Sequence, residues 1–399
     1  MNILFLTLLD FDTISERNIY TDLLREFSEN NHNVYIVSPF EKRSSKTEKI
    51  ISEDNSKILK VKIGNTQKTN LIEKGISTLT LEGFILKAIK REFSNVKFDL
   101  VLYSTPPITF AKVIEYVKKR DNAKAYLLLK DIFPQNAVDL EMFSKSSPIY
   151  KFFRQKEKKL YRVSDFIGCM SEANVRYLLD HNKNIDKEIV EICPNSFKVQ
   201  NIEISDEEKY AIRQKYGIPF DKRVLVYGGN IGKPQGIDYL MECLDAQRND
   251  PNNFYLVVGS GTEYQKLEKY YKESGQDNFK LITMLPRQDY ETLVNCCDIG
   301  LIFLDKRFTI PNFPSRMLSY MQAQMPIIAA TDKNTDIKDV LEDGDFGWWC
   351  ESRNAEDFSE IINGITDEEV LRKGENARKY LIDNYSVERC FSIIMERMK

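Results

Sequence analysis

Short apolar runs rich in β-branched and aromatic residues alternate along the whole chain with longer segments that have the period of an amphipathic helix. This pattern predicts strands and helices in alternation. The expected strands of the first half lie at 2–8, 34–38, 59–63, 99–103, 125–130, 165–170 and 189–193. Those of the second half lie at 223–228, 254–259, 279–283, 298–304, 326–330 and 346–350. Because these strands are mostly apolar, we expect parallel sheets covered by helices on both faces.

The alternation breaks once, near 194–222, and the break divides the chain into two expected domains. A polar, acidic helix at about 205–216 lies there, before a turn that contains glycine and proline. We expect doubly wound, Rossmann-like domains at 1–198 and 199–384, whose facing sheets form an interdomain cleft suited to two substrates. The polar segment 41–57 is predicted to be a mobile loop.

Composition limits the class of protein. Of the 399 residues, 42% are hydrophobic and 29% are charged, which is typical of a folded globular chain and not of a disordered or fibrous one. Residues 1–200 carry 32 lysines and arginines against 26 acidic residues, and the remainder carries 25 against 34. This mildly basic first half lacks the strong basic patch of a nucleic-acid binder. It suits contact with an anionic surface by one half of the chain.

Neither the cysteines nor the N-terminus indicates export. Seven cysteines without a C-x-x-C spacing indicate a reducing cytosol and no zinc site. The apolar N-terminal run is interrupted by Thr7 and stopped by Asp10, and no run of 18 apolar residues follows. The two histidines, His32 and His181, lie in polar turns and are expected to be solvated, which argues against histidine catalysis and histidine-rich metal sites.

Two glycine-containing turns in the second half each follow an expected strand and precede a helix. The first runs from Gly228 to Gly236 and contains Lys233, which can face phosphate oxygens. The second contains Gly259 and Gly261. Neither turn is a Walker loop or a clean G-x-G-x-x-G motif, so an ordinary strand-to-helix turn with a surface lysine is an equal alternative.

A third segment, 311–321, places Ser315 and Arg316 directly after Pro314 at an expected helix start. Ser315 is predicted to cap that helix, and Arg316 can grip a phosphate with two hydrogen bonds. Taken alone, a capped helix with a solvated arginine is the better interpretation.

In the first half, Lys130 and Asp131 stand at the carboxyl end of an apolar strand. A carboxylate there can orient an acceptor hydroxyl or accept its proton, and a helix-capping aspartate fits the position equally well. The stretch 148–162 interleaves aromatic residues with lysines and arginines. Its aromatics are expected to pack inward, while its basic face can still meet an anionic membrane.

Three blocks of the chain resemble glycosyltransferase family 4, whose members are retaining enzymes of the GT-B fold. They are most similar to the bacterial surface-polysaccharide branch that includes N-acetyl-L-fucosamine transferases. The blocks are Lys130-Asp131-Ile132-Phe133-Pro134-Gln135, Gly229-Asn230-Ile231-Gly232-Lys233-Pro234-Gln235-Gly236 and Pro314-Ser315-Arg316-Met317-Leu318-Ser319-Tyr320-Met321. The resemblance covers essentially the whole chain. It implies an α/β, GT-B architecture of two facing Rossmann-like domains, with the final segment, about 385–399, packed on the first domain.

The resemblance implies a nucleotide-sugar donor held mainly by the second domain. In the wider family a Glu-x7-Glu pair grips the donor, but Pro311 and Ser319 stand at those positions here. The usual arginine and lysine of the phosphate loop are likewise replaced by Asn230 and Gln235. The expected donor-binding residues are Gly229, Asn230, Gly232, Gln235, Gly236, Gly259, Gly261, Leu285, Pro286, Ser315, Ser319 and Tyr320.

Retaining transfer in this fold is described as a front-face displacement in which the donor diphosphate itself helps to deprotonate the acceptor. The protein then supplies position and positive charge, and no metal or other cofactor is expected. The resemblance assigns Lys233 and Arg316 to the leaving group and Asp131 to the acceptor. The expected acceptor-binding residues are Asp10, Arg17, Asn18 and Lys130.

The function that these expectations favour is transfer of an N-acetylated sugar, 6-deoxy sugars such as N-acetyl-L-fucosamine included, from UDP to a polyprenyl-diphosphate-linked saccharide. Such an enzyme of capsule or O-antigen synthesis is expected to be cytoplasmic and peripheral at the inner face of the membrane, with no nucleic-acid partner. A UDP-sugar 2-epimerase of the same architecture is an alternative, although it would need histidine and carboxylate clusters. A catalytically silent GT-B subunit is another, and the missing glutamate pair favours it.

Overall fold

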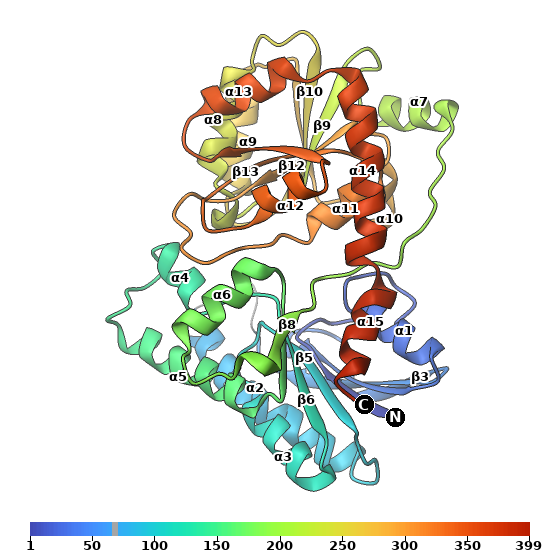
Figure 1. The fold of residues 1–399 in the computed structure, drawn as a ribbon, viewed down its shortest axis with the longest axis vertical. Coiled ribbons are helices and arrows are strands. Elements are labelled where there is room, and N and C mark those ends of the chain that lie inside the picture. The colour runs from blue at the N-terminus through green and yellow to red at the C-terminus, as the bar shows by residue number, and fades with distance from the viewer. Residues whose placement is uncertain (66–70) are drawn as a thin grey trace. The chain divides into compact units, whose positions relative to one another are not determined.

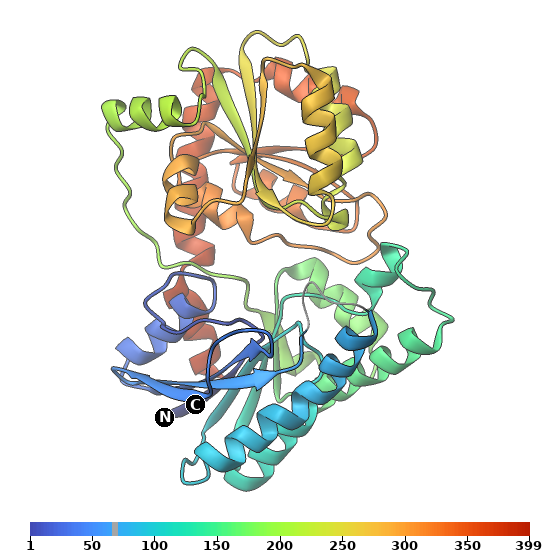
Figure 2. The ribbon, with the colours of Figure 1, turned by 180° about the vertical axis from the view of Figure 1, so that it is seen from behind.

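The computed structural model describes residues 1–65 and 71–399, apart from the side chains of 71–76, 78 and 79. The chain divides into two compact units, Met1–Lys198 with Val387–Lys399, and Val199–Ser386. Each unit has one sheet with helices on both faces (Figures 1 and 2). The predicted fold class, two α/β units with parallel sheets, is confirmed.

The sheet of the first unit has the strand order β3-β4-β2-β1-β5-β6-β7-β8. All neighbouring strands are parallel except β3, which pairs antiparallel with β4. The strands are β1 (Asn2–Leu6), β2 (Asn33–Glu41), β3 (Lys49–Glu53), β4 (Ser56–Ile63), β5 (Leu100–Ser104), β6 (Lys124–Leu129), β7 (Phe166–Cys169) and β8 (Val190–Ile192).

Two hydrophobic cores lie on opposite faces of this sheet because successive side chains of a strand point to opposite sides. In β1, Leu4 and Leu6 join the core packed against α2 (Leu71–Glu92), α3 (Ala111–Asp121) and α5 (Pro148–Val163), whereas Ile3 and Phe5 join the core packed against α1 (Thr21–Glu29) and α15 (Val387–Glu396). The other helices are α4 (Gln135–Asp139) and α6 (Glu172–His181), with a 3-10 turn at Lys187–Ile189.

The sheet of the second unit is parallel throughout, in the order β11-β10-β9-β12-β13-β14. Its strands are β9 (Arg223–Asn230), β10 (Asn253–Ser260), β11 (Phe279–Thr283), β12 (Ile299–Phe303), β13 (Ile327–Thr331) and β14 (Gly347–Glu351). Its helices are α7 (Asp206–Lys215), α8 (Ile237–Ala246), α9 (Tyr264–Ser274), α10 (Arg287–Val294), α11 (Arg316–Gln322), α12 (Ile337–Asp343), α13 (Ala355–Gly364) and α14 (Asp367–Tyr385), with a 3-10 turn at Lys233–Gln235. Residues of α8, α9 and α13 share one core with β9 and β10, whereas Tyr320 of α11 packs on Gly300 of β12.

Helices begin where a short polar side chain can accept a hydrogen bond from the first turn. Ser205 and Glu208 form a complete capping box at the start of α7, which places the expected acidic helix within 205–216. The side chains of Ser147, Ser171, Asn354 and Thr366 cap α5, α6, α13 and α14 in the same way.

The prediction of a mobile loop over 41–57 is wrong. This segment contains β3 and the start of β4, joined by a two-residue turn at Asp54 and Asn55, where Asp54 has a φ of 47°. Ile51 turns toward the core of the sheet while Ile50 and Ser52 on either side of it are exposed, and Glu53 at the end of β3 accepts hydrogen bonds from Thr13 and Ser15. Short edge strands with charged ends resemble loops in composition.

Within the residues that the structure describes, no helix combines the length and the apolar character needed to cross a bilayer.

Candidate functional site

The two glycine turns of the second unit are joined to each other at the carboxyl ends of β9 and β10. Ser260 pairs with Asn230 at the end of the two strands. The backbone N–H of Ile231 donates to the carbonyl of Ser260 at 2.9 Å, and that of Glu263 donates to the carbonyl of Ile231 at 2.9 Å. The turns therefore form a single structure at the edge of the sheet where ligands bind in open parallel sheets.

Glycine is required at several positions of this double turn. Gly229 has a φ of +114° and Gly236 a φ of +56°, values that side chains other than glycine rarely adopt. A Cβ on Gly259 would lie 1.9 Å from the carbonyl oxygen of Gly229, and one on Gly261 would lie 2.2 Å from that of Ile231. The backbones approach too closely for any side chain, so an ordinary turn does not account for these glycines.

Asn230 and Gln235 hold the turn together. The Asn230 side-chain amide donates to Gln235 Oε1 at 3.0 Å, and the N–H of Gly232 donates to the same oxygen at 3.3 Å. Asn230 and Gln235 stand where the wider family has an arginine and a lysine, and here their side chains hydrogen-bond to each other. Lys233 is exposed, forms no ion pair within the described chain, and lines an open hollow with Arg307 and neighbouring residues.

Arg316 lies beside Gly229 at the start of α11. Its guanidinium carbon is 4.3 Å from the centre of the Tyr227 ring, and its Nη2 is 3.8 Å from where a Cβ of Gly229 would stand. Its Nη1 is buried and has no hydrogen-bond partner among the described residues, and no carboxylate there forms an ion pair with it. A buried cation without a counter-ion marks a place for an anionic ligand.

Tyrosine hydroxyls surround this guanidinium. Burial alone would lower the pKa of Arg316, but the phenolic oxygens of Tyr227 and Tyr320 raise it, so the group stays charged. Burial raises the pKa of Tyr290 to about 12. The Tyr227 hydroxyl donates to the carbonyl of Asn230 at 2.6 Å, which fixes the ring under the arginine.

Of the expected donor-binding residues, Tyr320 has a structural role, and Ser315 lacks the capping role predicted for it. Tyr320 is fully buried, and its hydroxyl accepts from the N–H of Gly228 at 3.0 Å and donates to the carbonyl of Leu301 at 3.2 Å. It therefore braces β9 and does not face a ligand. Ser315 does not cap α11, because its own backbone is already helical and its side chain makes no capping hydrogen bond.

The remaining expected donor residues lie nearby without a specific polar contact. Ser319 is half-buried on α11. Leu285 is half-buried and Pro286 exposed in the loop that follows β11, where the Ser260 hydroxyl lies 3.7 Å from the sulfur of Met284.

In the first unit, Asp131 lies directly after β6 and is held by two neighbours. The side-chain amide of Asn136 donates to both carboxylate oxygens, at 2.9 and 3.0 Å. Thr105 Oγ1 accepts from the N–H of Asp131 at 3.1 Å and donates to its carbonyl at 3.0 Å. Burial raises the pKa of Asp131 to about 6. Since α4 begins after Pro134, Asp131 is not a helix cap.

Lys130 points elsewhere. Its ammonium lies 3.4 Å from the carbonyl of Cys193, and burial lowers its pKa. The structure therefore does not bring the charged groups of Lys130 and Asp131 together.

The other expected acceptor residues are engaged within the first unit. Asp10 accepts from Lys46 at 2.8 Å and from the fully buried Lys60 at 2.6 Å. Arg17 donates to the carbonyl of Lys198 at 2.9 Å. The side chain of Asn18 accepts from two N–H groups at the start of α1. These contacts shape the loop after β1.

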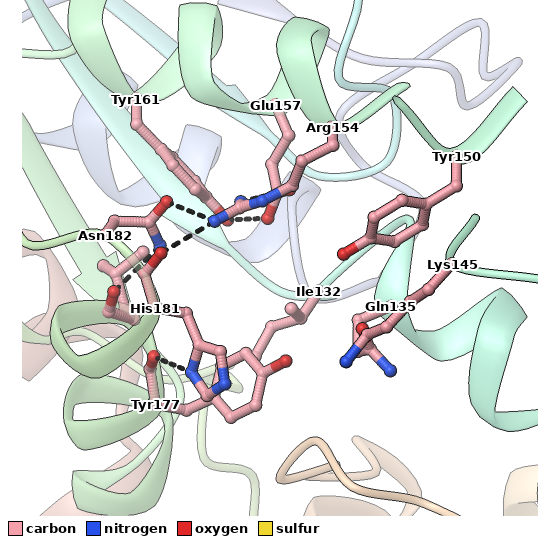
Figure 3. Close-up of a pocket in the computed structure, with 11 residues that line it drawn as sticks. Ile132, Gln135, Lys145, Tyr150, Arg154, Glu157, Tyr161, Tyr177, His181 and Asn182 are labelled. Atoms are coloured by element: carbon pink, nitrogen blue, oxygen red, sulfur yellow. Dashed lines mark hydrogen bonds and ion pairs between the residues drawn. The ribbon is translucent and has the colours of Figure 1, made fainter. Parts of the chain in front are cut away.

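Sequence reasoning missed Thr105 and the surroundings of His181. Thr105 directly follows another strand, β5, 26 residues before Asp131, and no motif marks it. His181 is not simply solvated: it ends α6 and stacks on Tyr177, with ring centres 3.9 Å apart. The two rings line a hollow of the first unit near Ile132 (Figure 3). The spacing of Tyr177 and His181, four residues apart on a helix, was the available signal.

Comparison with known proteins agrees with this geometry. Residues 208–384 match the model of the family described as glycosyl transferases group 1. A similar curated protein is the "Probable glycosyltransferase WbjE" of Pseudomonas aeruginosa, 23% identical over 327 residues that cover 82% of this chain and 80% of that protein. The "Putative colanic acid biosynthesis glycosyl transferase WcaI" of Escherichia coli K12 is 21% identical over 62% of this chain and 60% of its own length.

Solved structures show the same fold. Sucrose-phosphate synthase of Thermosynechococcus elongatus has a TM-score of 0.74 at 14% identity, covering 99% of this chain and 97% of that one. HepE of Anabaena, in complex with UDP and glucose, has a TM-score of 0.70 at 14% identity, covering 100% and 99%. The fold is GT-B, as the sequence blocks predicted.

Proposed function

Since this chain is a glycosyltransferase whose second unit carries a group 1 domain, we propose that it transfers an N-acetylated sugar from a UDP-sugar to a polyprenyl-diphosphate-linked saccharide. The second unit holds the donor and the first unit holds the acceptor. The sugars considered include 6-deoxy sugars such as N-acetyl-L-fucosamine. The name of the relative WcaI, a protein of colanic acid biosynthesis, supports a surface polysaccharide as the product.

The observation that carries the donor assignment is the Arg316 guanidinium beside Gly229, whose buried Nη1 has no hydrogen-bond partner among the described residues. A diphosphate supplies the anionic oxygens that Nη1 lacks, in charge-assisted hydrogen bonds. The Anabaena structure that shares this fold contains UDP, which supports UDP as the nucleotide. Lys233, exposed on the same double turn, adds a second positive charge near the phosphates.

Transfer proceeds with retention in this proposal. The bond between the sugar C1 and the diphosphate oxygen breaks, and the acceptor oxygen forms a bond to C1 on the same face. The proton of the acceptor hydroxyl passes to the departing diphosphate. Arg316 stabilises the negative charge that develops there, so neither a metal nor another cofactor is required.

Asp131 positions the acceptor hydroxyl. Its carboxylate, held by Asn136 and the Thr105 turn, can accept a hydrogen bond from that hydroxyl when it is ionised. A pKa of about 6 keeps the group ionised near neutral pH.

A lipid-linked acceptor requires contact with a membrane, and one face of α5 suits it. Ile149 and Phe152 are 54% and 39% exposed, and Met142 in the preceding loop is 64% exposed. Lys151 is exposed beside them, and the ammonium of Lys156 lies 5.7 Å from the Phe152 ring centre. Apolar side chains beside lysines favour peripheral binding at the anionic inner face of the cell membrane.

The first test is a thermal-shift screen of the protein with UDP, GDP, CMP, TDP and NAD and their sugar conjugates. A ligand at a hundredfold excess over its Kd adds about 2.7 kcal/mol to the apparent stability. We expect a shift with UDP and a larger one with a single UDP-sugar. A protein that no nucleotide stabilises would instead be a silent GT-B subunit, and conversion of a UDP-sugar without acceptor would indicate an epimerase.

The second test is co-sedimentation with vesicles that contain phosphatidylglycerol. Wild-type protein is expected to sediment at low salt, and Phe152→Ser to sediment less. Protein that stays in the supernatant at low salt would contradict a lipid-linked acceptor.

A further inference from the structure

The hollow between α5 and α6 of the first unit, here called the α5–α6 hollow, has no role in the assignments made above. It is lined by Tyr150 and Arg154 of α5, Tyr177 and His181 of α6, and Ile132 and Gln135 near α4 (Figure 3). Its cavity volume is about 40 Å³, below the range of enclosed small-molecule sites, so a ligand there would lie partly in solvent.

One wall of the hollow is fixed by a closed network of hydrogen bonds and an ion pair. The Arg154 guanidinium donates to Glu157 Oε2 at 2.5 Å, to the carbonyl of His181 at 2.8 Å and to Asn182 Oδ1 at 2.7 Å. The Tyr161 hydroxyl donates to the other oxygen of Glu157 at 2.8 Å. The network joins α5 to the end of α6, so the wall is formed before any ligand arrives and its two charges neutralise each other.

The opposite side offers uncharged polar groups and an aromatic face. The Tyr150 hydroxyl points into the hollow (Figure 3) and has no hydrogen-bond partner among the described residues. His181 Nδ1 must donate to the carbonyl of Tyr177, 2.9 Å away, because a carbonyl only accepts. Its Nε2 is therefore left as an acceptor in the neutral ring. Tyr177 and His181 stack face to face at an angle of 20°, so each ring covers one face of the other and leaves only its outer face for a ligand.

The hollow is continuous with the segment that holds the acceptor carboxylate. Ile132, which lines it, follows Asp131 in the chain. Asn136, which donates to Asp131, follows Gln135, which also lines the hollow. A molecule in the hollow would contact Ile132 and Gln135, which belong to the segment that carries Asp131.

We infer that the α5–α6 hollow binds one sugar residue of the acceptor saccharide. A pyranose has an apolar face of C–H groups, which packs on an aromatic surface, and hydroxyls that both donate and accept. The hollow provides an outer ring face of the stacked Tyr177 and His181 pair, the Tyr150 hydroxyl, which both donates and accepts, and a ring nitrogen of His181 that accepts. Because the charges of Arg154 and Glu157 are paired, a neutral sugar fits better than a phosphate, although Lys145 at the rim leaves room for an acidic substituent.

This inference rests on the proposed function, since it names a part of the acceptor. Saturation-transfer NMR tests it with the methyl glycosides of glucose, galactose, N-acetylglucosamine and fucose, each at millimolar concentration. We expect saturation transfer to the ring protons of at least one glycoside. Tyr177→Leu should abolish the signal and Tyr150→Phe should reduce it several-fold.

Tyr116→Phe is the matched control, because Tyr116 is also half-buried on a helix of the first unit but lies outside the hollow. It should leave the signal unchanged. If Tyr177→Leu does not fold, His181→Ala replaces it, with the same loss expected. Saturating UDP should not suppress the signal.

Three results would overturn the inference: no transfer to any of the four glycosides, equal transfer in folded hollow variants and wild type, or suppression by UDP, which would place the sugar in the donor site. The thermal shift with UDP, measured on the same samples, reports the donor site separately. If no glycoside binds the hollow but UDP still raises the thermal stability, only the inference about the hollow is contradicted. The proposed transferase function is then unaffected.

Discussion

Arg316 in the second unit and Asp131 in the first are both charged groups withdrawn from water, but they are supported in opposite ways. Arg316 lies on the Tyr227 ring with a buried N–H group that no described residue satisfies. Asp131 has both oxygens occupied by Asn136 and forms no ion pair within the described chain. Arg316 thus lacks a partner for its charge. The Asp131 carboxyl has hydrogen-bond partners, but its raised pKa means that it loses its charge more easily than an ordinary carboxyl.

The difference decides what each group can recognise. An arginine cannot lose its proton in a protein, so Arg316 is a permanent cation that suits a diphosphate. The carboxyl of Asp131, with a pKa of about 6, changes charge close to neutral pH and suits a hydroxyl whose hydrogen bond depends on ionisation. The second unit is thus suited to bind a fixed anion, and the first to respond to protonation.

The largest expected effect comes from Asp131→Asn. The variant keeps the size of the side chain but removes the charged acceptor of the hydroxyl hydrogen bond, so the transfer rate should fall by about 10²-fold or more. In the wild type the carboxylate is lost as pH falls through about 6, so kcat/KM should fall there too, and Asp131→Asn should lose this inflection. Release of UDP in the presence of the lipid-linked acceptor measures the rate.

Asp180→Asn is the control for this variant, because Asp180 is exposed and, among the described residues, its one ion pair is with Lys183. UDP should stabilise Asp131→Asn as much as it does the wild type. A rate within twofold of wild type would remove Asp131 from the acceptor site.

Arg316→Gln should weaken UDP binding by about 10-fold to 100-fold, because a hydrogen bond to a charged group stabilises by about 1.5–3 kcal/mol. Titration calorimetry with UDP measures the change. Arg248→Gln, which removes an exposed arginine paired with Asp245, should bind UDP like the wild type. If Arg316→Gln also binds UDP normally, the Arg316 guanidinium does not bind the diphosphate of the donor.

Most of the fold follows from the sequence because the strands are apolar on both faces and the helices are amphipathic. The expected strand 279–283 coincides with β11, and most others differ by one or two residues at their ends. The hairpin at β3 was missed because its strand is short, lies at the edge of the sheet, and carries Lys49 and Glu53 at its ends.

For the candidate site, the sequence predicted at which strand ends the residues lie, but not which way their side chains point. Lys130 and Asp131 follow a strand as expected, yet their side chains diverge, because Thr105, directly after the neighbouring strand β5, accepts from both of their N–H groups and fixes the turn. No local pattern connects residues 26 positions apart. The sequence also did not reveal that the Ser315 backbone is helical. Pro314 followed by Ser315 is compatible both with a capping serine and with a serine in the first helical turn.

Asp332 in the second unit tests whether a raised pKa by itself indicates function. Burial raises the pKa of this carboxyl to about 6, as for Asp131, but its Oδ1 accepts from the N–H groups of Asn334 and Thr335 in a tight turn. That turn supports the loop before α11, because Asn334 donates to the carbonyl of Phe308. A structural role accounts for these contacts.

Asp332→Asn should therefore stabilise the fold. The ordinary carboxyl pKa is 3.8, so the folded state binds more protons than the unfolded state between pH 3.8 and about 6, and the free energy of unfolding falls as pH rises through that window. The asparagine keeps the turn without the buried charge, which is expected to add about 2–3 kcal/mol at pH 8 and about half of that at pH 5. Urea unfolding at both values measures this, and a loss of stability at pH 8 would contradict it.

Tyr320→Phe has the smallest expected effect on UDP binding. It tests whether the Tyr320 hydroxyl only stabilises the donor site or also contacts the donor itself. Without the phenolic oxygen, the buried N–H of Gly228 loses its acceptor, which should cost about 1–2 kcal/mol in urea unfolding. The ring remains packed against Gly300, so Gly229 and Arg316 keep their places and the Kd for UDP should change by less than about threefold. A rise in Kd as large as that of Arg316→Gln would mean that the Tyr320 hydroxyl reaches the nucleotide, as the sequence blocks imply. An unchanged Kd with lowered stability would leave Arg316 as the group of this pair that recognises the anion, and would limit the Tyr320 hydroxyl to bracing β9 through Gly228.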